Sequence, residues 1–287
     1  MTEKLVDIVF VLDATKSTQC VFYGMTLHVE DQTFDIMSKN TKAKYQYGAV
    51  IYRDPVSYKP SPTEKQPLSA EEIDQLNRIY AKEKEIRKQK LIEKGIYNEE
   101  NERRREEQKF NVDRVKFPVD KNVAIPFCDN IETLSIELGK VECDGGNDDQ
   151  EDWVGALSLA LNDFNWREGS KRCIFWISDA NAHGKSFNAK GEDNYNEEEP
   201  KLMNLTQQMA EKRIYFVGIN IKKGTDPGCE KTLNAMKEVY ESNGGPSFMI
   251  QEFKVTVDPE LGNDDWTPTE LGDFEKTITQ SLRDLGP

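Results

Sequence analysis

Short apolar segments alternate with longer amphipathic segments along most of this chain, and this alternation restricts the fold more than any other feature. The apolar segments are rich in β-branched and aromatic residues and cover residues 5–12, 45–52, 173–177, 214–219 and 248–250. Such runs are typical of strands buried on both faces of a parallel sheet. Segments with helical spacing lie near residues 22–36, 132–138, 153–164, 229–240 and 271–282, and a further segment ends near residue 212. Alternating strands and helices form right-handed βαβ units. We therefore expect a Rossmann-like, doubly wound α/β fold, with a mostly parallel sheet flanked by helices.

Residues 56–124 differ in composition from the rest of the chain. Prolines open this segment, and Lys, Arg and Glu then dominate it. We interpret residues 1–287 as one domain that carries a charged, partly helical insertion over 56–124. Such a charged segment is most often a solvated surface helix, and docking to a partner is the alternative. Residues 123–127 are expected to form an edge strand, because Pro126 cannot donate to a sheet ladder. Asp129 is the expected N-cap of the helix that follows.

The charge balance excludes several kinds of partner. Asp and Glu outnumber Lys and Arg by 52 to 38, which gives a net charge of −14. Nucleic-acid duplexes and anionic membrane surfaces attract basic proteins, so neither is expected as a partner. The first apolar run is short and is broken by Asp7, so it is interpreted as neither a signal peptide nor a membrane span.

The cysteines and histidines restrict the chemistry further. The five cysteines are scattered and contain no CxxC pair: Cys20, Cys128, Cys143, Cys173 and Cys229. An odd, scattered set indicates reduced thiols in a cytoplasmic protein rather than a disulfide framework or a zinc site. With only 2 histidines in the chain, chemistry based on histidine is nearly excluded.

Acidic residues follow the buried strands at the positions where a ligand site is expected. Asp13 and Asp179 each come directly after an apolar segment, and an acidic, Gly-rich turn at 144–149 precedes a helix. The carboxyl ends of parallel strands share one edge of the sheet, where open α/β sheets bind ligands. Carboxylates gathered there repel one another. Together with the hydroxyls of Thr15 and Ser17 they form an all-oxygen ligand set, which suits Mg²⁺, Mn²⁺ or Ca²⁺ better than zinc.

Three segments resemble the metal-binding loops of von Willebrand factor type A (vWA) domains. They are Asp13-x-Thr15-x-Ser17, the Gly-Gly-Asn-Asp-x-x-Glu-Asp turn at 145–152, and Ile-Ser-Asp-Ala at 177–180. The Asp-Ala-x-x-His-Gly sequence at 179–184 and Tyr-Arg-Asp at 52–54 are similar to the intracellular, alpha-kinase-associated type of this domain. The resemblance extends over nearly the whole chain except the insertion.

This resemblance implies a metal-ion-dependent adhesion site (MIDAS), in which a divalent cation keeps one coordination position open for a carboxylate of a protein partner. Asp13, Thr15 and Ser17 would be first-loop ligands, directly or through water. Asp148 would be the ligand from the second loop and Asp179 the ligand from the third. Mg²⁺ is the expected cation, with Mn²⁺ or Ca²⁺ as alternatives. The neighbouring residues that would contact the partner are Lys16, Asn147, Asn181 and His183.

The first two of these loops depart from the usual motif. Thr15 stands where Ser is usual, which keeps the hydroxyl, and Asp148 stands where Thr is common. Asp148 has the motif's spacing to the acids that follow it, which favours it over Asp144 and Asp149. Lys16 stands where a small residue is more usual. A cation at that position would weaken metal binding or replace the metal's charge.

Each of these features also has a simpler explanation. Asp13 and Ser17 are residue types that cap helices. The acidic turn at 144–152 is also what a solvated loop before a helix looks like. His183 has an alternative role as a structural histidine of a loop. The sequence at 16–18 resembles the end of a phosphate-binding loop, but the glycines that such a loop requires are missing.

The resemblance favours a non-catalytic protein-interaction module that binds its partners through the metal site. The alternative is a structural or scaffold component of a large assembly, which would use the charged insertion and retain a vestigial metal site. A Mg²⁺-dependent phosphotransfer enzyme is the third hypothesis, because Asp13 follows the first strand, as the nucleophile of such enzymes does. That hypothesis is disfavoured because Thr15 stands where such sites place a second carboxylate. We therefore expect no enzymatic activity.

Overall fold

The structure is a computed structural model that describes residues 4–15, 18, 43–53, 88–89, 92, 122–141, 143, 150–187, 195, 197–223, 226–255, 276 and 280. Contacts between residues divide the chain into two units, residues 1–59 with 116–287 and residues 60–115. The second unit contributes three described residues, which are all helical: Lys88, Gln89 and Ile92. Within the described ranges, no helix has the length and apolar character needed to cross a membrane.

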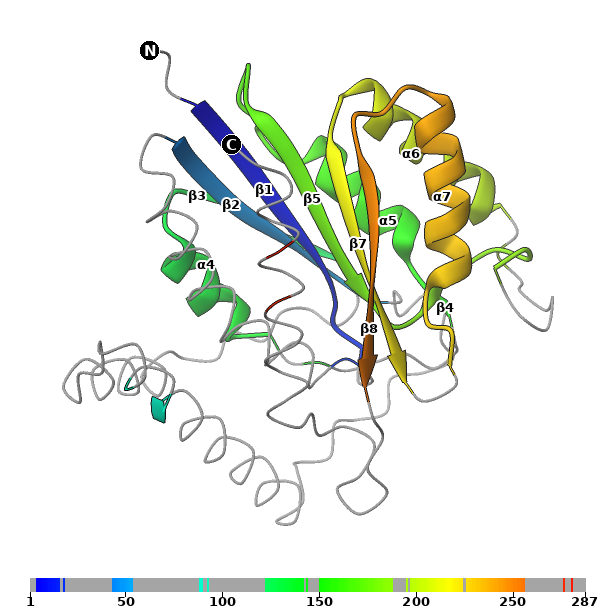
Figure 1. The fold of residues 1–287 in the computed structure, drawn as a ribbon, viewed down its shortest axis with the longest axis horizontal. Coiled ribbons are helices and arrows are strands. Elements are labelled where there is room, and N and C mark those ends of the chain that lie inside the picture. The colour runs from blue at the N-terminus through cyan, green and yellow to red at the C-terminus, as the bar shows by residue number, and fades with distance from the viewer. Residues whose placement is uncertain are drawn as a thin grey trace. The chain divides into compact units, whose positions relative to one another are not determined.

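Six strands of the first unit form one sheet, in the order β3-β2-β1-β5-β7-β8 (Figure 1). Their bounds are β1 Lys4–Asp13, β2 Ala43–Tyr52, β3 Val123–Cys128, β5 Lys171–Ser178, β7 Tyr215–Lys223 and β8 Phe248–Val255. Every neighbouring pair is parallel except β2 and β3. The strand order runs outward in both directions from the β1–β5 pair, so the sheet is doubly wound. The predicted fold class is confirmed, and β3 is the edge strand expected around Pro126.

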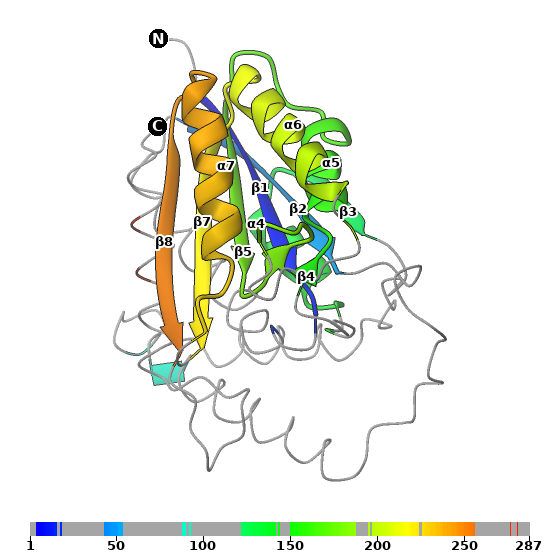
Figure 2. The ribbon, with the colours of Figure 1, turned by 90° about the vertical axis from the view of Figure 1, so that its right-hand side faces the viewer.

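Helices cover both faces of this sheet (Figures 1 and 2). They are α4 Ile131–Leu138, α5 Trp153–Asn162, α6 Glu198–Glu211 and α7 Glu230–Ser242. Side chains along β1 alternate between the two faces, as a period of two requires. Ile8 and Phe10 pack in the cluster that contains the buried residues of α4. Val9 and Val11 pack in the cluster formed with α5, α6 and α7. Both faces of the sheet are buried under helices, which explains why the strand sequences are almost continuously apolar.

The N-cap of α4 differs from the prediction. The backbone N–H of Glu132 donates to the side-chain oxygen of Asn130 at 2.9 Å, so Asn130 is the N-cap. Asp129 instead accepts a hydrogen bond from the Gln46 side chain at 3.1 Å. Asp and Asn cap helices about equally well, so the sequence pattern could not separate two adjacent candidates.

A second, two-stranded sheet was not expected from the sequence. It joins β4 Gln150–Glu151 to β6 Asn181–Ala182 in parallel, with Gln150 paired to Asn181. Both strands are too short for a period-two pattern to be visible. This sheet places the segment that follows the acidic turn beside the segment that follows β5.

Several predicted features lie outside the described residues. They are the helix near 22–36, the acidic turn at 144–149, and nearly all of the insertion at 56–124 and of the helix at 271–282. The bounds of the insertion and its place within one domain therefore stay predictions.

Candidate metal centre

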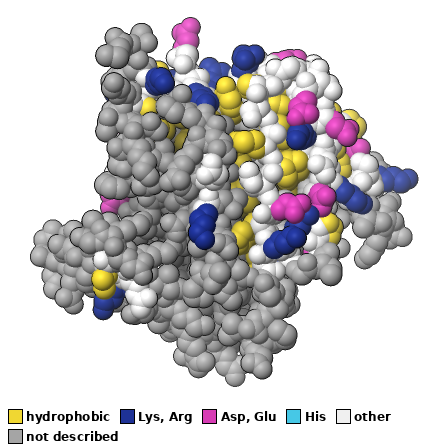
Figure 3. Space-filling model, viewed as in Figure 1, with side chains coloured by type: hydrophobic (Ala, Val, Ile, Leu, Met, Phe, Trp, Pro, Cys, Tyr) yellow, Lys and Arg dark blue, Asp and Glu magenta, His cyan; other side chains and the backbone are white. Residues whose placement is uncertain are grey.

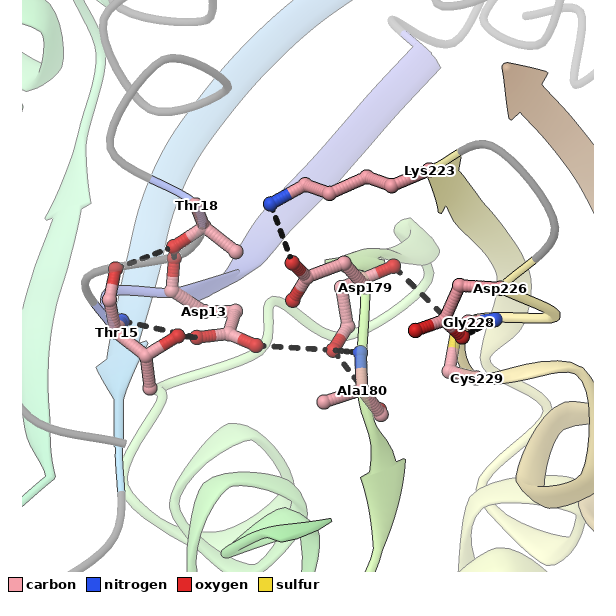
Figure 4. A network of polar contacts seen from close by, with 10 residues as sticks. Asp13, Thr15, Thr18, Asp179, Ala180, Lys223, Asp226, Gly228 and Cys229 are labelled. Carbon is pink, nitrogen blue, oxygen red and sulfur yellow. Dashed lines mark hydrogen bonds and ion pairs between the residues drawn. The ribbon is translucent and has the colours of Figure 1, made fainter. Parts of the chain in front are cut away.

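The two strand-end carboxylates predicted to meet do lie at the same edge of the sheet. β1 and β5 are parallel neighbours, with Leu12 paired to Ile177. Asp13 is the last residue of β1, and Asp179 is the first residue after β5. Figure 4 shows both carboxylates at this edge, which is also where the winding direction of the sheet reverses. Ligand sites of open α/β sheets form at such a reversal point.

The carboxylate of Asp13 is held on both oxygens. Its Oδ1 accepts hydrogen bonds from the backbone N–H of Thr15 at 3.0 Å and from the Thr15 hydroxyl at 2.8 Å. Its Oδ2 accepts from the Ser178 hydroxyl at 3.1 Å, which links β1 to β5. The Thr18 hydroxyl lies 2.8 Å from the main-chain oxygen of Asp13 and 2.9 Å from that of Thr15. Thr18 is therefore held against the end of β1.

Burial makes the charge of Asp13 costly. The side chains of Asp13 and Thr15 are buried, at 3% and 1% exposure. Burial raises the pKa of Asp13 and the nearby negative charge of Asp179 adds to this effect, so the pKa reaches about 7 against the hydrogen bonds from Thr15 and Ser178, which lower it. A positive charge at this edge would relieve that repulsion.

Lys223 supplies such a charge, and it was not among the site residues expected from the sequence. Its Nζ lies 2.9 Å from Oδ2 of Asp179, whose side chain is only 8% exposed (Figure 4). The other oxygen, Oδ1 of Asp179, is buried and has no hydrogen-bond partner. Lys223 is the last residue of β7, which we expected to end at 219. The available signal was a pair of lysines closing a buried strand, at the edge where Asp13 and Asp179 were already expected.

The loop from β7 to α7 packs tightly against this edge. Asn220 accepts a hydrogen bond from the Cys229 backbone N–H at 2.8 Å and donates to the Pro227 carbonyl at 3.0 Å. Gly228 has a φ of +61°, and a Cβ there would lie 2.3 Å from Oδ1 of Asn220. Asp226 accepts from the Gly228 backbone N–H at 2.8 Å. Only glycine fits this turn, because the position combines a left-handed backbone with a close approach.

Two residues predicted to contact a partner are engaged inside the protein. The Asn181 side chain donates to the Gly228 carbonyl at 2.9 Å and accepts from the backbone N–H and the hydroxyl of Thr232, at 3.1 and 3.0 Å. It fastens β6 to the start of α7 and has little capacity left for a partner. His183 is 2% exposed, and its ring packs edge-on against Tyr195 at 4.8 Å. This placement matches the alternative role of His183 as a structural histidine, and the partner-binding roles of both residues stay predictions.

The other predicted site residues lie outside the part of the chain that the structure describes: Lys16, Ser17, Asn147 and Asp148. The structure thus brings together Asp13, Thr15 and Asp179 of the predicted ligands and adds Ser178 and Lys223. Within the described part, no group of three or more His, Cys, Asp or Glu side chains could hold a metal ion.

The donors that are present fit a hard cation. Two carboxylates and the Thr15 hydroxyl are oxygen ligands of the kind that Mg²⁺, Mn²⁺ and Ca²⁺ prefer. Oδ1 of Asp179 is the clearest sign that a ligand fits here, because buried polar atoms are rarely left without a hydrogen-bond partner.

Comparison with known proteins shows which solved structures share this fold. No protein-family model matches the sequence, and no curated protein matches it. Among solved structures, the pilus adhesin SpaC from Lactobacillus rhamnosus GG in its open conformation is similar over 98% of this chain, with 9% identity and a TM-score of 0.50. The chain spans only 30% of the SpaC chain. The strand order and this similarity together identify the fold. The fold is of the vWA type.

Two further structures are similar at lower scores. Proximal thread matrix protein 1 from the mussel byssus matches 97% of this chain and 46% of its own, with 11% identity and a TM-score of 0.45. The conserved hypothetical protein BatB from Bacteroides thetaiotaomicron matches 97% of this chain and 99% of its own, with 11% identity and a TM-score of 0.43. At such identities the likeness concerns the fold alone. The finer resemblance to the alpha-kinase-associated type stays a prediction.

Proposed function

We propose that this chain is a non-catalytic protein-interaction module whose binding surface is completed by a divalent cation at the carboxyl edge of the sheet. The observation that carries this proposal is the buried, unpartnered Oδ1 of Asp179 beside the buried carboxylate of Asp13. The proposed ligands are Asp13, Thr15, Ser17, Asp148 and Asp179, and the proposed cation is Mg²⁺, with Mn²⁺ or Ca²⁺ as alternatives.

The two-stranded sheet supports Asp148 as the second-loop ligand. Gln150 pairs with Asn181 in parallel. In the sequence, Asp148 precedes Gln150 by the same number of residues as Asp179 precedes Asn181. The two acids are therefore equivalent positions relative to this pairing. Neither Asp144 nor Asp149 has this relationship.

The proposed partner is a protein that presents an Asp or Glu side chain. When bound, the cation supplies a fixed positive charge that a carboxylate can complete from outside. The net charge of −14 disfavours nucleic acid and anionic membrane surfaces as partners. On the face seen in Figure 3, the described residues carry both acidic and basic side chains.

The chemistry around the carboxylates supports a binding role rather than catalysis. The side chains that contact Asp13 and Asp179 within the described part are the hydroxyls of Thr15 and Ser178 and the ammonium of Lys223. The nearby Cys229 thiol is fully buried, and burial raises its pKa well above the ordinary value, so it stays protonated and weakly nucleophilic.

Calorimetric titration with Mg²⁺, Mn²⁺ and Ca²⁺ tests the proposal. The variant is the double substitution Asp13→Ala/Asp179→Ala. The matched control is Asp129→Ala/Asp163→Ala, which removes two exposed carboxylates elsewhere. We expect saturable one-site binding by the wild type and the control, and none by the site variant. A folded wild type that binds none of the three cations would refute the metal-dependent function.

A scaffold role is the second candidate, and the Lys223–Asp179 ion pair favours it. An ammonium that already pairs with Asp179 is what a vestigial metal site would contain. In that case the charged insertion would make the functional contacts. Deletion of residues 70–110 would then abolish assembly, while Asp13→Ala would leave it intact. The opposite pattern would favour the metal-dependent module.

We also propose a cytoplasmic location. Among the described cysteines, Cys128, Cys173 and Cys229 are free thiols, which supports a reducing compartment. Localisation of a tagged full chain by fluorescence microscopy tests this, and a secreted or surface-bound chain would contradict it.

A further inference from the structure

Three charged side chains from three strand ends converge at the proposed site: Asp13 at the end of β1, Asp179 directly after β5 and Lys223 at the end of β7 (Figure 4). We infer that Lys223 is a built-in counter-cation of this site, which a divalent ion must displace from Asp179 in order to bind. This inference rests on the proposed metal site and adds the residue that sets the site's affinity.

The position of Lys223 is specific rather than incidental. Lys222, its neighbour in sequence, pairs with Glu230 and Glu252, both at 2.8 Å. Alternation along β7 sends the two lysines to different partners. Asn220 pairs with Ser178 across β5 and β7, so Lys223 lies beyond the end of β5, and its long side chain reaches back to the carboxylate.

The environment strengthens this ion pair. The side chain of Asp179 is 8% exposed and that of Lys223 is 21% exposed, so solvent screens the pair only partly. An exposed pair such as Lys237 with Glu241, at 3.8 Å and 40% and 59% exposure, is screened far more. Lys223 thus neutralises a charge that would otherwise lie beside Asp13 in a desolvated site.

An ammonium and a divalent ion cannot share this carboxylate without repulsion. Like charges a few ångströms apart repel strongly where water is scarce. A cation bound between Asp13 and Asp179 would bring two positive charges next to Nζ of Lys223. Metal binding therefore includes the release of Lys223, and the wild-type affinity is lowered by that step. From the sequence, such an effect was expected at Lys16, and we place it at Lys223.

The test compares metal affinity among variants of the full chain. Lys223→Met removes the charge and keeps the stem, Lys223→Arg keeps the charge, and Lys222→Gln is the matched control one residue away. Titrations with MgCl₂ by calorimetry should show tighter binding by Lys223→Met, by about fivefold or more. Lys223→Arg and Lys222→Gln should stay close to the wild type.

Thermal unfolding in the presence of a chelator gives a second readout, in which Lys223→Met should be less stable than the wild type although it binds metal more tightly. Lys223→Met leaves Asp179 unpaired, so it should melt lower than the wild type by about 3 °C or more, and saturating MgCl₂ should remove the difference. Lys223→Gln, whose amide can still donate to Asp179, is the second variant should the Met variant fail to fold.

The outcomes separate this inference from the proposed function. Equal Mg²⁺ affinity of the wild type and Lys223→Met would overturn the inference and leave the proposed function intact. Binding by Lys223→Met alone would support the inference and show that the wild-type site is silenced. Binding by neither protein would overturn both.

Discussion

The Ser178 hydroxyl lies 3.1 Å from Oδ2 of Asp13 and joins the carboxyl ends of β1 and β5 at the point where the sheet changes its winding direction. Ser178 is fully buried, so this hydrogen bond is not exchanged with water. It fixes the orientation of the carboxylate that we propose as the first ligand. Ser178 was recognised in the sequence only as part of a motif, and the structure gives it a positioning role.

Ser178→Ala is therefore expected to reduce the free energy of unfolding by about 1–2 kcal/mol, because a buried carboxylate oxygen loses its donor. It should also weaken Mg²⁺ binding, since Asp13 loses one of its orienting contacts. Urea denaturation and calorimetry measure the two effects. Ser242→Ala, which removes a hydroxyl from an exposed position, is the control. An unchanged affinity would show that Thr15 alone orients Asp13.

Near the opposite end of β1, an ion pair between a buried carboxylate and a partly exposed arginine separates stability from binding. Asp7 is fully buried, and its Oδ1 accepts from Nε of Arg167 at 2.7 Å, while its Oδ2 accepts from the Ser170 hydroxyl at 2.7 Å. Arg167→Ala should destabilise the protein by about 3–5 kcal/mol, because Asp7 is left charged and buried without its partner. In a chain that remains folded, Mg²⁺ affinity should be unchanged. The control is Lys237→Ala, at an exposed position. A parallel loss of metal binding would contradict the separation of the two edges.

Gly228 provides a prediction with a control inside the same chain. Gly228→Ala should cost about 2 kcal/mol or more, because φ is +61° and the new Cβ would lie 2.4 Å from the Ile221 carbonyl oxygen. Gly169→Ala also places alanine at a positive φ, +72°, but meets no atom within 4 Å. That variant should cost only about 1 kcal/mol. Urea denaturation of both variants measures the difference. Equal costs would mean that the close approach to β7 adds nothing.

Two buried tyrosines should respond in opposite ways to the loss of a hydroxyl. Tyr47 is fully buried and its hydroxyl has no hydrogen-bond partner, so Tyr47→Phe should leave stability unchanged or raise it slightly. Tyr240 donates to the Ile214 carbonyl, so Tyr240→Phe should cost about 1–2 kcal/mol. Thermal unfolding of the two variants, in one buffer, checks the contrast. A destabilised Tyr47→Phe would show that its hydroxyl has a partner in solution.

The sequence predicted the strands well because burial on both faces leaves a continuous apolar run. The segments at 5–12 and 45–52 correspond to β1 and β2 within one or two residues at each end. β7 was predicted too short, because Asn220, Lys222 and Lys223 interrupt its apolar pattern. Strand ends at the carboxyl edge become polar where they reach the site, so hydropathy stops indicating a strand at the residues that carry function.

The pairing of Lys223 with Asp179 could not be derived from the sequence. Asp179 follows β5 and Lys223 ends the neighbouring strand β7, and β6 and α6 lie between them in the chain, so their contact depends on strand register and side-chain reach. The roles of Asn181 and His183 depend in the same way on where α7 and Tyr195 pack. By contrast, the meeting of Asp13 and Asp179 follows from one topological rule, that parallel strands end at a common edge.

The central claim is that a divalent cation binds between Asp13 and Asp179 and releases Lys223. A crystal structure of the full chain grown with MnCl₂ tests it most directly, because anomalous scattering locates Mn²⁺ without reference to the protein. The account predicts an anomalous peak within coordination distance of both carboxylates, with Nζ of Lys223 withdrawn from its 2.9 Å contact with Asp179. Ordered carboxylates with no peak, and Lys223 still paired with Asp179, would contradict it.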